Sequence, residues 1–91
     1  MEIWKYEEVN FTNTSVNSSG VGGYYSAGKN LTVPDGYMPV GATFKGDYTT
    51  GVYPVIYQTE QSTKRIALNC SKSVTGVNAN LYVHYVRIHP V

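Results

Sequence analysis

The stretch Asn80-Leu81-Tyr82-Val83-His84-Tyr85-Val86-Arg87-Ile88 has the composition of a β-strand with large side chains on both faces. A strand sends alternate side chains to opposite sides of its sheet. One side here carries Leu81, Val83, Tyr85 and Arg87, and the other carries Tyr82, His84, Val86 and Ile88. A sheet with one solvated face would make one of these two sets polar. The stretch therefore predicts a strand covered on both sides, and the simplest second cover is another copy of the chain.

The size and composition of the chain also favour assembly. Its 91 residues predict one small domain, and such a domain buries only about 60–65% of its unfolded surface. The single cysteine cannot form a disulfide within the chain, and oligomerisation is a common remedy for small cores. Charged residues make up 14% of the chain, against roughly 25% in ordinary soluble domains, whereas tyrosine occurs nine times. This composition is typical of surfaces that make contacts through rings, hydroxyls and amides.

Nucleic acids and membranes are not expected as partners. The formal net charge is +1, and Lys64-Arg65 is the only basic cluster, whereas binding to a phosphate backbone needs a basic stripe or patch. No stretch approaches the roughly 18 consecutive apolar residues of a membrane span. The segment Met1–Tyr6 also lacks the basic and apolar regions of a signal peptide, so we expect the chain to be either cytoplasmic or exported by another route, such as release inside a virus particle.

Glycine and proline occur every few residues, and the stretches between them favour Val, Thr, Tyr and Ile, as strands do. The segment nearest the N-terminus could instead form one short helical turn. Strands are expected near residues 2–6, 8–16, 24–33, 38–45, 52–59, 63–70 and 80–88. Strands at this spacing predict an all-β fold, an antiparallel β-sandwich or jelly roll of about seven strands.

The connections between these strands carry recognisable turn residues. We expect a flexible glycine loop at 17–23, a Pro34-Asp35-Gly36 turn, a hairpin-like loop at 46–51 and a long connection at 71–79. No linker divides the chain, so residues 1–91 are predicted to form one sandwich domain. Within it, the N-terminal strands and the glycine loop occupy 1–23, and the core lies in 24–91.

Alternation predicts which side chains face inward. The inward sets are Ile66, Leu68 and Cys70 in one strand, and Val40, Ala42 and Phe44 in another. In the strand at 52–59, Val55 and Tyr57 alternate with Pro54 and Ile56, so this strand also lacks a polar face. Pro54 cannot donate a backbone hydrogen bond and indicates an edge, a bulge or a bend. A second strand with two apolar faces strengthens the prediction of assembly.

Few residues could carry catalysis. The Asp35 carboxylate lies in a turn, where it usually bonds nearby amides. Cys70 has no acid or histidine at a recognisable spacing and is expected to be a buried apolar group. His84 lies in mid-strand as an interior or interface residue, and it could bind a metal only if copies met at an axis. The chain is therefore expected not to be an enzyme and to need no cofactor or metal.

Tyrosines near loops favour binding instead. Tyr48 is expected at a loop tip beside Asp47 and Thr49, and Tyr24 and Tyr25 follow the glycine loop. A tyrosine offers a flat apolar face and a hydroxyl, the two features that recognise a sugar. These five residues are the candidate ligand site, although the tyrosines could instead pack the sheet or an interface. The candidate oligomer-interface residues are Tyr82, His84, Val86, Ile88 and Ile56.

Two segments of the chain resemble a known class of viral domain. They are Val33-Pro34-Asp35-Gly36-Tyr37-Met38-Pro39-Val40-Gly41 and the closing stretch from Arg65-Ile66-Ala67-Leu68-Asn69 to Leu81-Tyr82-Val83-His84-Tyr85-Val86-Arg87. They resemble the C-terminal β domains of tail and baseplate proteins of tailed bacteriophages, especially receptor-binding (host-adhesion) proteins of phages of Gram-positive bacteria. The resemblance covers residues 31–88 and implies a homotrimeric sandwich or jelly-roll head on the virion. It also implies that this head recognises host cell-wall saccharides or teichoic acids.

Two other functions stay open at this point. A purely structural virion component, such as a head fibre, decoration or tail-assembly protein, would use the aromatic residues for contacts with its own copies or with other virion proteins. A bacterial carbohydrate-binding module would be a stable monomer. Adhesion predicts saturable binding to a glycan, whereas the structural role predicts tight association with a particle protein.

Overall fold

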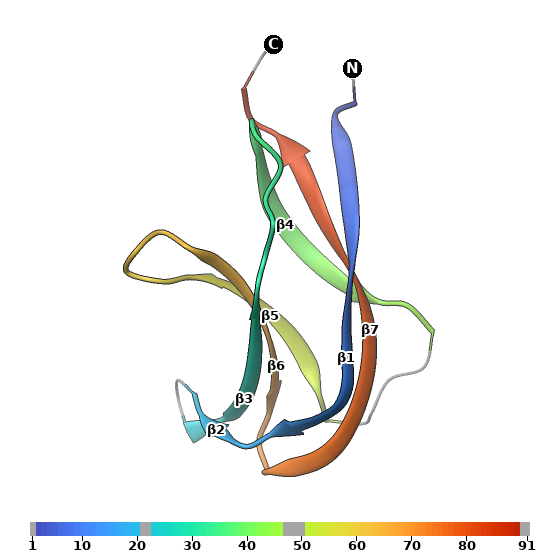
Figure 1. Cartoon of the computed structure of the whole chain (residues 1–91), viewed down its shortest axis with the longest axis vertical. Helices are drawn as coiled ribbons and strands as arrows, with labels where there is room; N and C mark the ends of the chain where they lie inside the picture. The colour runs from blue at the N-terminus through green and yellow to red at the C-terminus, as the bar shows by residue number, and fades with distance from the viewer. Residues whose placement is uncertain (1, 21–22, 47–50, 90–91) are drawn as a thin grey trace.

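The last strand lies at the centre of one of two β-sheets in the computed structural model, which describes residues 2–20, 23–46 and 51–89. β7 (Val74–Arg87) lies between β1 (Trp4–Val16) and β4 (Tyr37–Phe44) in a sheet that we call sheet A. Sheet B has the order β2-β3-β6-β5, with bounds β2 (Ser18–Ser19), β3 (Tyr25–Asn30), β6 (Lys64–Cys70) and β5 (Tyr53–Gln58). All strand pairs are antiparallel (Figure 1). The predicted all-β sandwich of about seven strands is confirmed.

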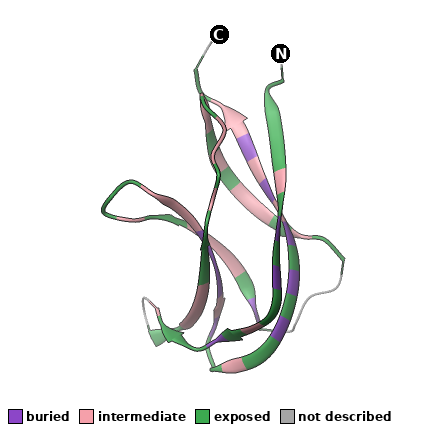
Figure 2. Ribbon diagram, viewed as in Figure 1, coloured by how far each residue is buried: buried purple, intermediate pink, exposed green. Residues whose placement is uncertain are grey.

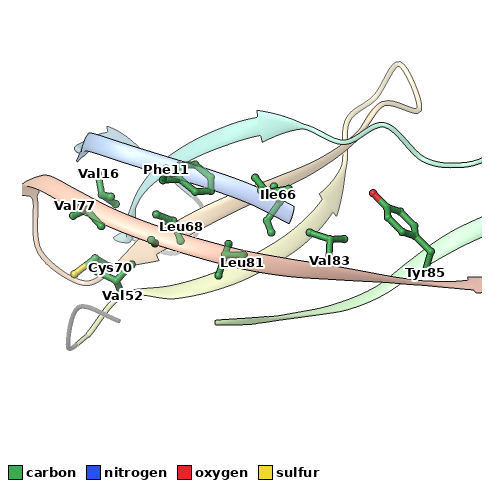
Figure 3. Close-up of a cluster of buried hydrophobic side chains, with 12 residues drawn as sticks. Phe11, Val16, Val52, Ile66, Leu68, Cys70, Val77, Leu81, Val83 and Tyr85 are labelled. Atoms are coloured by element: carbon green, nitrogen blue, oxygen red, sulfur yellow. The ribbon is translucent and has the colours of Figure 1, made fainter. Parts of the chain in front are cut away.

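One hydrophobic core lies between the two sheets (Figure 3). Ile66 and Leu68 of β6 are fully buried and Cys70 is 5% exposed, so the inward set predicted for this strand is confirmed. β1 adds Phe11 and Val16 to the same cluster. The core therefore extends into residues 1–23, which the sequence had placed outside it.

β1 is one long strand where two were expected. It follows β7 from the Trp4–Val86 pair to the Val16–Val74 pair, and this pairing excludes a helical turn at its start. The register shifts after Phe11, where Asn13 adopts a left-handed conformation with φ 45° and its N–H donates to Asn78 Oδ1 at 2.9 Å. The irregularity bends the strand without ending it, as β-bulges do.

β7 begins earlier than predicted. Residues 71–79 were expected to form a long connection, but Val74–Ala79 are part of the strand and pair with β1. Their Ser, Thr and Asn content suggested a loop, yet Val77 and Ala79 are buried while Thr75 and Asn78 are exposed. This is the alternation of a strand with one solvated face.

The predicted hairpin at 46–51 is wrong, because β4 belongs to sheet A and β5 to sheet B. The connection therefore crosses from one sheet to the other; its residues 47–50 lie outside the described part of the chain. β5 is an edge strand of sheet B, as Pro54 indicated.

A β-bulge in β4 overturns one further expectation. Ala42 and Phe44 pack against the core as predicted, but Val40 is 49% exposed. The register of β4 on β7 shifts between Pro39 and Gly41, so an extra residue enters the strand at Val40. Strict alternation from Phe44 back to Val40 therefore fails.

At the far end of the core, the Tyr85 side chain is buried and its hydroxyl donates a hydrogen bond to Glu7 Oε1. Burial is the main cause that raises the pKa of Tyr85 above its usual value of 10.0. The hydrogen bond to the Glu7 carboxylate and the charge of that carboxylate raise the pKa further. The unfolded chain therefore loses this proton more easily than the folded one. The protonated Tyr85 hydroxyl therefore contributes its full stabilisation below about pH 10. This contribution is lost as the pH rises through the higher pKa that Tyr85 has in the folded protein.

We accordingly expect the free energy of unfolding to fall as the pH rises above about 10, and to fall less steeply in Tyr85→Phe. Urea unfolding of both proteins at a series of alkaline pH values measures this. The other tyrosines act as an internal control because both proteins contain them. Equal slopes in the two proteins would contradict the assignment to Tyr85.

Candidate binding groove and assembly surface

The outer face of sheet B forms a shallow groove. Because Ile66 and Leu68 point into the core, the alternate residues Arg65, Ala67 and Asn69 point outward. Their partners on the neighbouring strands share this side. The groove has a volume of about 160 Å³. It is lined by Gly20, Ser26, Val55, Tyr57, Ala67 and Asn69. We call it the sheet B groove.

Small residues on β3 and β6 leave the groove open, and the Tyr57 side chain forms one of its sides. Gly28 lies opposite Ala67, and a Cβ at Gly28 would come within 2.9 Å of Arg65 Nη2 and 3.2 Å of the Tyr57 hydroxyl. Arg65 Nε donates to the Tyr57 hydroxyl at 2.8 Å, and Arg65 Nη1 donates to Asn30 Oδ1 at 2.5 Å. Glycine at this position therefore allows Arg65 to lie across the sheet and hold the Tyr57 ring in place.

A second pair of aromatic rings lies beyond the groove. The Tyr24 and Tyr53 rings meet edge to face, with centroids 6.2 Å apart and an interplanar angle of 83°. Tyr53 shares the outer side of β5 with Val55 and Tyr57. The Tyr24 carbonyl accepts a hydrogen bond from the N–H of Gly20 at 2.8 Å, which ties this residue to the rim of the groove. Aromatic rings therefore continue along the same outer face.

The residues predicted to bind a ligand have different outcomes. Tyr24 is exposed beside the groove, as a ligand-binding residue would be. Tyr25 pairs with buried Cys70 and packs against the core, so it faces away from the groove and that expectation is wrong. Asp47, Tyr48 and Thr49 lie outside the described residues.

The outer face of sheet A is a second aromatic surface. The paired residues Trp4 and Val86, and Tyr6 and His84, share one side of the sheet, and Met38 joins them from β4. Trp4 and Tyr6 are 61% and 67% exposed and lie in the solvent-exposed first half of β1 (Figure 2). The Tyr6 and Tyr82 rings meet edge to face with centroids 5.3 Å apart. We call this surface the sheet A face; it consists of Trp4, Tyr6, Met38, Tyr82, His84 and Val86.

Polar groups on and beside the sheet A face bond to one another. Lys45 Nζ lies 2.7 Å from Glu8 Oε1 and 5.6 Å from the centre of the Tyr82 ring. The hydrogen bond from Lys45 to Glu8, and then the charge of Glu8, raise the pKa of Lys45. His84 Nε2 lies 3.0 Å from Thr43 Oγ1. The face therefore offers apolar rings and edges, with its ionic groups already paired.

The predicted interface residues are mostly on this face. Tyr82, His84 and Val86 are partly exposed on it, and Ile88, just past the end of β7, is 49% exposed. Ile56 is different, because it pairs with Ile66 and packs against the core, so its assignment to the interface is wrong. β7 is thus buried on one side and partly open on the other.

Sequence reasoning missed Met38 on the sheet A face, and Tyr53 and Tyr57 beside the groove. It left open whether Trp4 and Tyr6 pack the sandwich or lie on a neighbouring subunit. Each lies on a strand that was predicted, and the inward set of β6 was recognised. The missing information was the pairing of strands, because only the registers of β1 and β4 on β7, and of β5 on β6, bring these side chains together. No short motif marks such a pairing.

Metal-ligating side chains do not gather in the described residues. Cys70 is buried, and the described part of the chain holds no cluster of three or more His, Cys, Asp and Glu residues that could bind a metal ion. Across residues 2–20, 23–46 and 51–89, no helix is long and apolar enough to span a membrane. Comparisons with protein-family models, with curated proteins and with solved structures found no match to this chain.

Proposed function

We propose that this protein is a non-enzymatic adhesion module that binds cell-surface saccharide in the sheet B groove. The observation that carries the proposal is the combination of Tyr57, Asn69 and Ser26 around a floor of small residues. A ring face packs against the C–H groups of a sugar, and amide and hydroxyl groups bond to its hydroxyls. Arg65 holds Tyr57 in position before the ligand arrives, which lowers the entropic cost of binding.

The shallowness of the groove predicts weak binding by a single copy. Its volume of about 160 Å³ is below the roughly 300–1,000 Å³ of sites that enclose a small molecule. A sugar held there would leave much of its surface in water. Several copies on one particle would raise the effective affinity by about 10²–10⁴ when they engage the same surface together.

The sheet A face supports the assembly that such avidity needs. The exposed parts of Trp4, Tyr6 and Met38 on this face, together with Ile88 just past the end of β7, present apolar surface on the order of 400 Å² per copy. A stable interface buries about 800 Å² per partner, so this face could form the apolar centre of one. The proposed setting is the one that the phage resemblance implies, a homotrimeric head on the virion.

The test of this function is a titration of the isotope-labelled protein with soluble cell-wall oligosaccharides, in which nuclear magnetic resonance monitors binding. We expect saturable shifts in the backbone signals of Ser26, Ala67 and Asn69. Tyr57→Ala should weaken binding by about tenfold, the effect of about 1.4 kcal/mol from one lost ring contact. The matched control is Tyr6→Ala, which removes an exposed tyrosine of sheet A and should change single-copy affinity less than twofold.

Equal binding by Tyr57→Ala and the unchanged protein would place the ligand elsewhere. If no oligosaccharide binds while the protein forms a stable oligomer, the second candidate function is favoured. That function is a purely structural virion component, and the sheet A face is the observation that supports it. A pull-down with purified virion proteins would then identify the partner.

A further inference from the structure

A further cavity lies away from both surfaces, at the end of sheet A where β1 begins and β7 ends (Figure 1). It has a volume of about 440 Å³ and forms where the start of β1, the turn at 34–36 and the end of β7 meet. Its charged and polar lining groups come from Glu2, Lys5, Asp35, Tyr37, Arg87 and His89. We call it the terminal pocket.

Backbone hydrogen bonds join the three segments around this pocket. The N–H of Arg87 donates to the carbonyl of Ile3 at 2.9 Å, and the N–H of Ile88 donates to the carbonyl of Gly36 at 2.8 Å. The Tyr37 hydroxyl donates to the carbonyl of Glu2, which ties the turn side of the pocket to the chain before β1. The pocket is therefore built by the fold, since its walls depend on the same register that forms sheet A.

Lys5 and Arg87, the two cations of the pocket, have no carboxylate partner in residues 2–20, 23–46 and 51–89. Among the described residues, the only ion pair within 4.0 Å is the one between Lys45 and Glu8 on the sheet A face. Lys5 Nζ instead lies over the Tyr37 ring, 5.0 Å from its centre. Arg87 Nε donates to the carbonyl of His89 at 2.7 Å, while Arg87 Nη2 is buried and has no hydrogen-bond partner within the described part of the chain. An unsatisfied donor on a charged group is costly, and an anionic acceptor would remove that cost.

The two carboxylates of the pocket narrow the choice of anion. Glu2 and Asp35 line the same cavity and would repel an anion that met them directly. They accept hydrogen bonds, so a ligand that presents hydroxyl or ammonium donors to them and its anionic group to Lys5 and Arg87 would match all four charges. A bare anion would match Lys5 and Arg87 but would offer no donor to Glu2 and Asp35.

We propose that the terminal pocket binds an anionic group carried on a hydroxylated or amino-bearing small molecule, such as a polyol phosphate or a sugar acid. Lys5 supplies a compact point charge, and Arg87 contributes the planar fork that suits phosphate and carboxylate oxygens. The Tyr37 ring holds Lys5 on the side facing the pocket. This site does not depend on the sheet B groove, because the two share none of their lining residues.

The test is calorimetric and magnetic-resonance titration of the full chain with four probes: glycerol 3-phosphate, glucuronate, inorganic phosphate and uncharged glycerol. We expect glycerol 3-phosphate or glucuronate to bind saturably and to shift the Arg87 Nε–H signal, and glycerol not to bind. Lys5→Gln and Arg87→Lys should each weaken binding about tenfold or more, and Lys72→Gln, in the turn before β7, should change it less than twofold. Added salt should weaken it as well.

The relative affinities of the four probes decide between support for the site and its rejection. Tighter binding of glycerol 3-phosphate than of inorganic phosphate supports a role for Glu2 and Asp35, and Glu2→Gln should narrow that difference. Equal affinity for the two overturns the requirement for a donor-bearing carrier. No saturable binding, or binding that Lys5→Gln leaves unchanged, overturns the site. Lys5 is exposed in β1, so this variant remains informative even if Arg87→Lys is poorly folded.

Discussion

Replacing Leu68 with alanine is expected to lower the free energy of unfolding by about 3–5 kcal/mol. Leu68 is fully buried in β6, an interior strand with a neighbour on each side in sheet B, and belongs to the cluster between the sheets. The change removes apolar contact with both sheets and leaves a cavity that two paired sheets cannot close easily. Because small domains have only about 5–15 kcal/mol in total, much of the sample should be unfolded at physiological temperature.

Urea denaturation followed by tyrosine and tryptophan fluorescence measures this loss. Val40→Ala is the matched control, because Val40 also lies in a strand but is half exposed at the bulge of β4. We expect that control to cost less than about 1 kcal/mol. A loss below about 1 kcal/mol for Leu68→Ala would mean that the two sheets do not share the core described here.

Replacing Tyr6 with glutamate is expected to turn the proposed oligomer into a monomer. Tyr6 is the most exposed large apolar or aromatic residue in the described part of the chain and lies on the sheet A face against Tyr82. An aromatic residue at the centre of an interface commonly contributes about 2 kcal/mol or more, and a buried carboxylate without a partner adds a further penalty. The dissociation constant should rise by at least about 30-fold.

Light scattering on a sizing column gives the mass of each protein directly. Tyr53→Glu is the control, because Tyr53 is a partly exposed tyrosine on the outer face of sheet B. It should keep the mass of the unchanged protein. A monomeric unchanged protein at high concentration would rule out self-association, whereas an oligomeric Tyr6→Glu would place the interface on another surface.

The parts of the fold that could be predicted are those with strict alternation. β6 carries Ile66, Leu68 and Cys70 on one side in a strand without a bulge, so its inward face follows from spacing alone. The same reasoning fails at Val40, where one extra residue shifts every side chain before it. It also fails at 74–79, because the pairing with β1 overrides the loop-like composition of that segment.

The candidate sites were harder to predict than the fold because each combines strands that are distant in sequence. Tyr24 and Tyr25 are adjacent, yet one contacts Tyr53 on the surface and the other packs against the core. Sequence alone could not decide between them without the register of β3 on β6. The terminal pocket depends on the same kind of information, since Lys5 and Arg87 lie 82 positions apart.

The position of β7 in sheet A also determines the order in which the chain can fold. β1 and β4 each pair in that sheet with β7 and not with one another, and β7 is the last strand along the chain. During synthesis, sheet A therefore cannot start to form until β7 leaves the ribosome, whereas sheet B pairs strands that are all made earlier. Closing the Trp4–Val86 pair joins residues far apart in sequence, and such non-local pairing places folding in about the millisecond-to-second range. Until then, the aromatic residues of β1 are exposed to other nascent chains, so β1 is the segment that a molecular chaperone would be expected to bind.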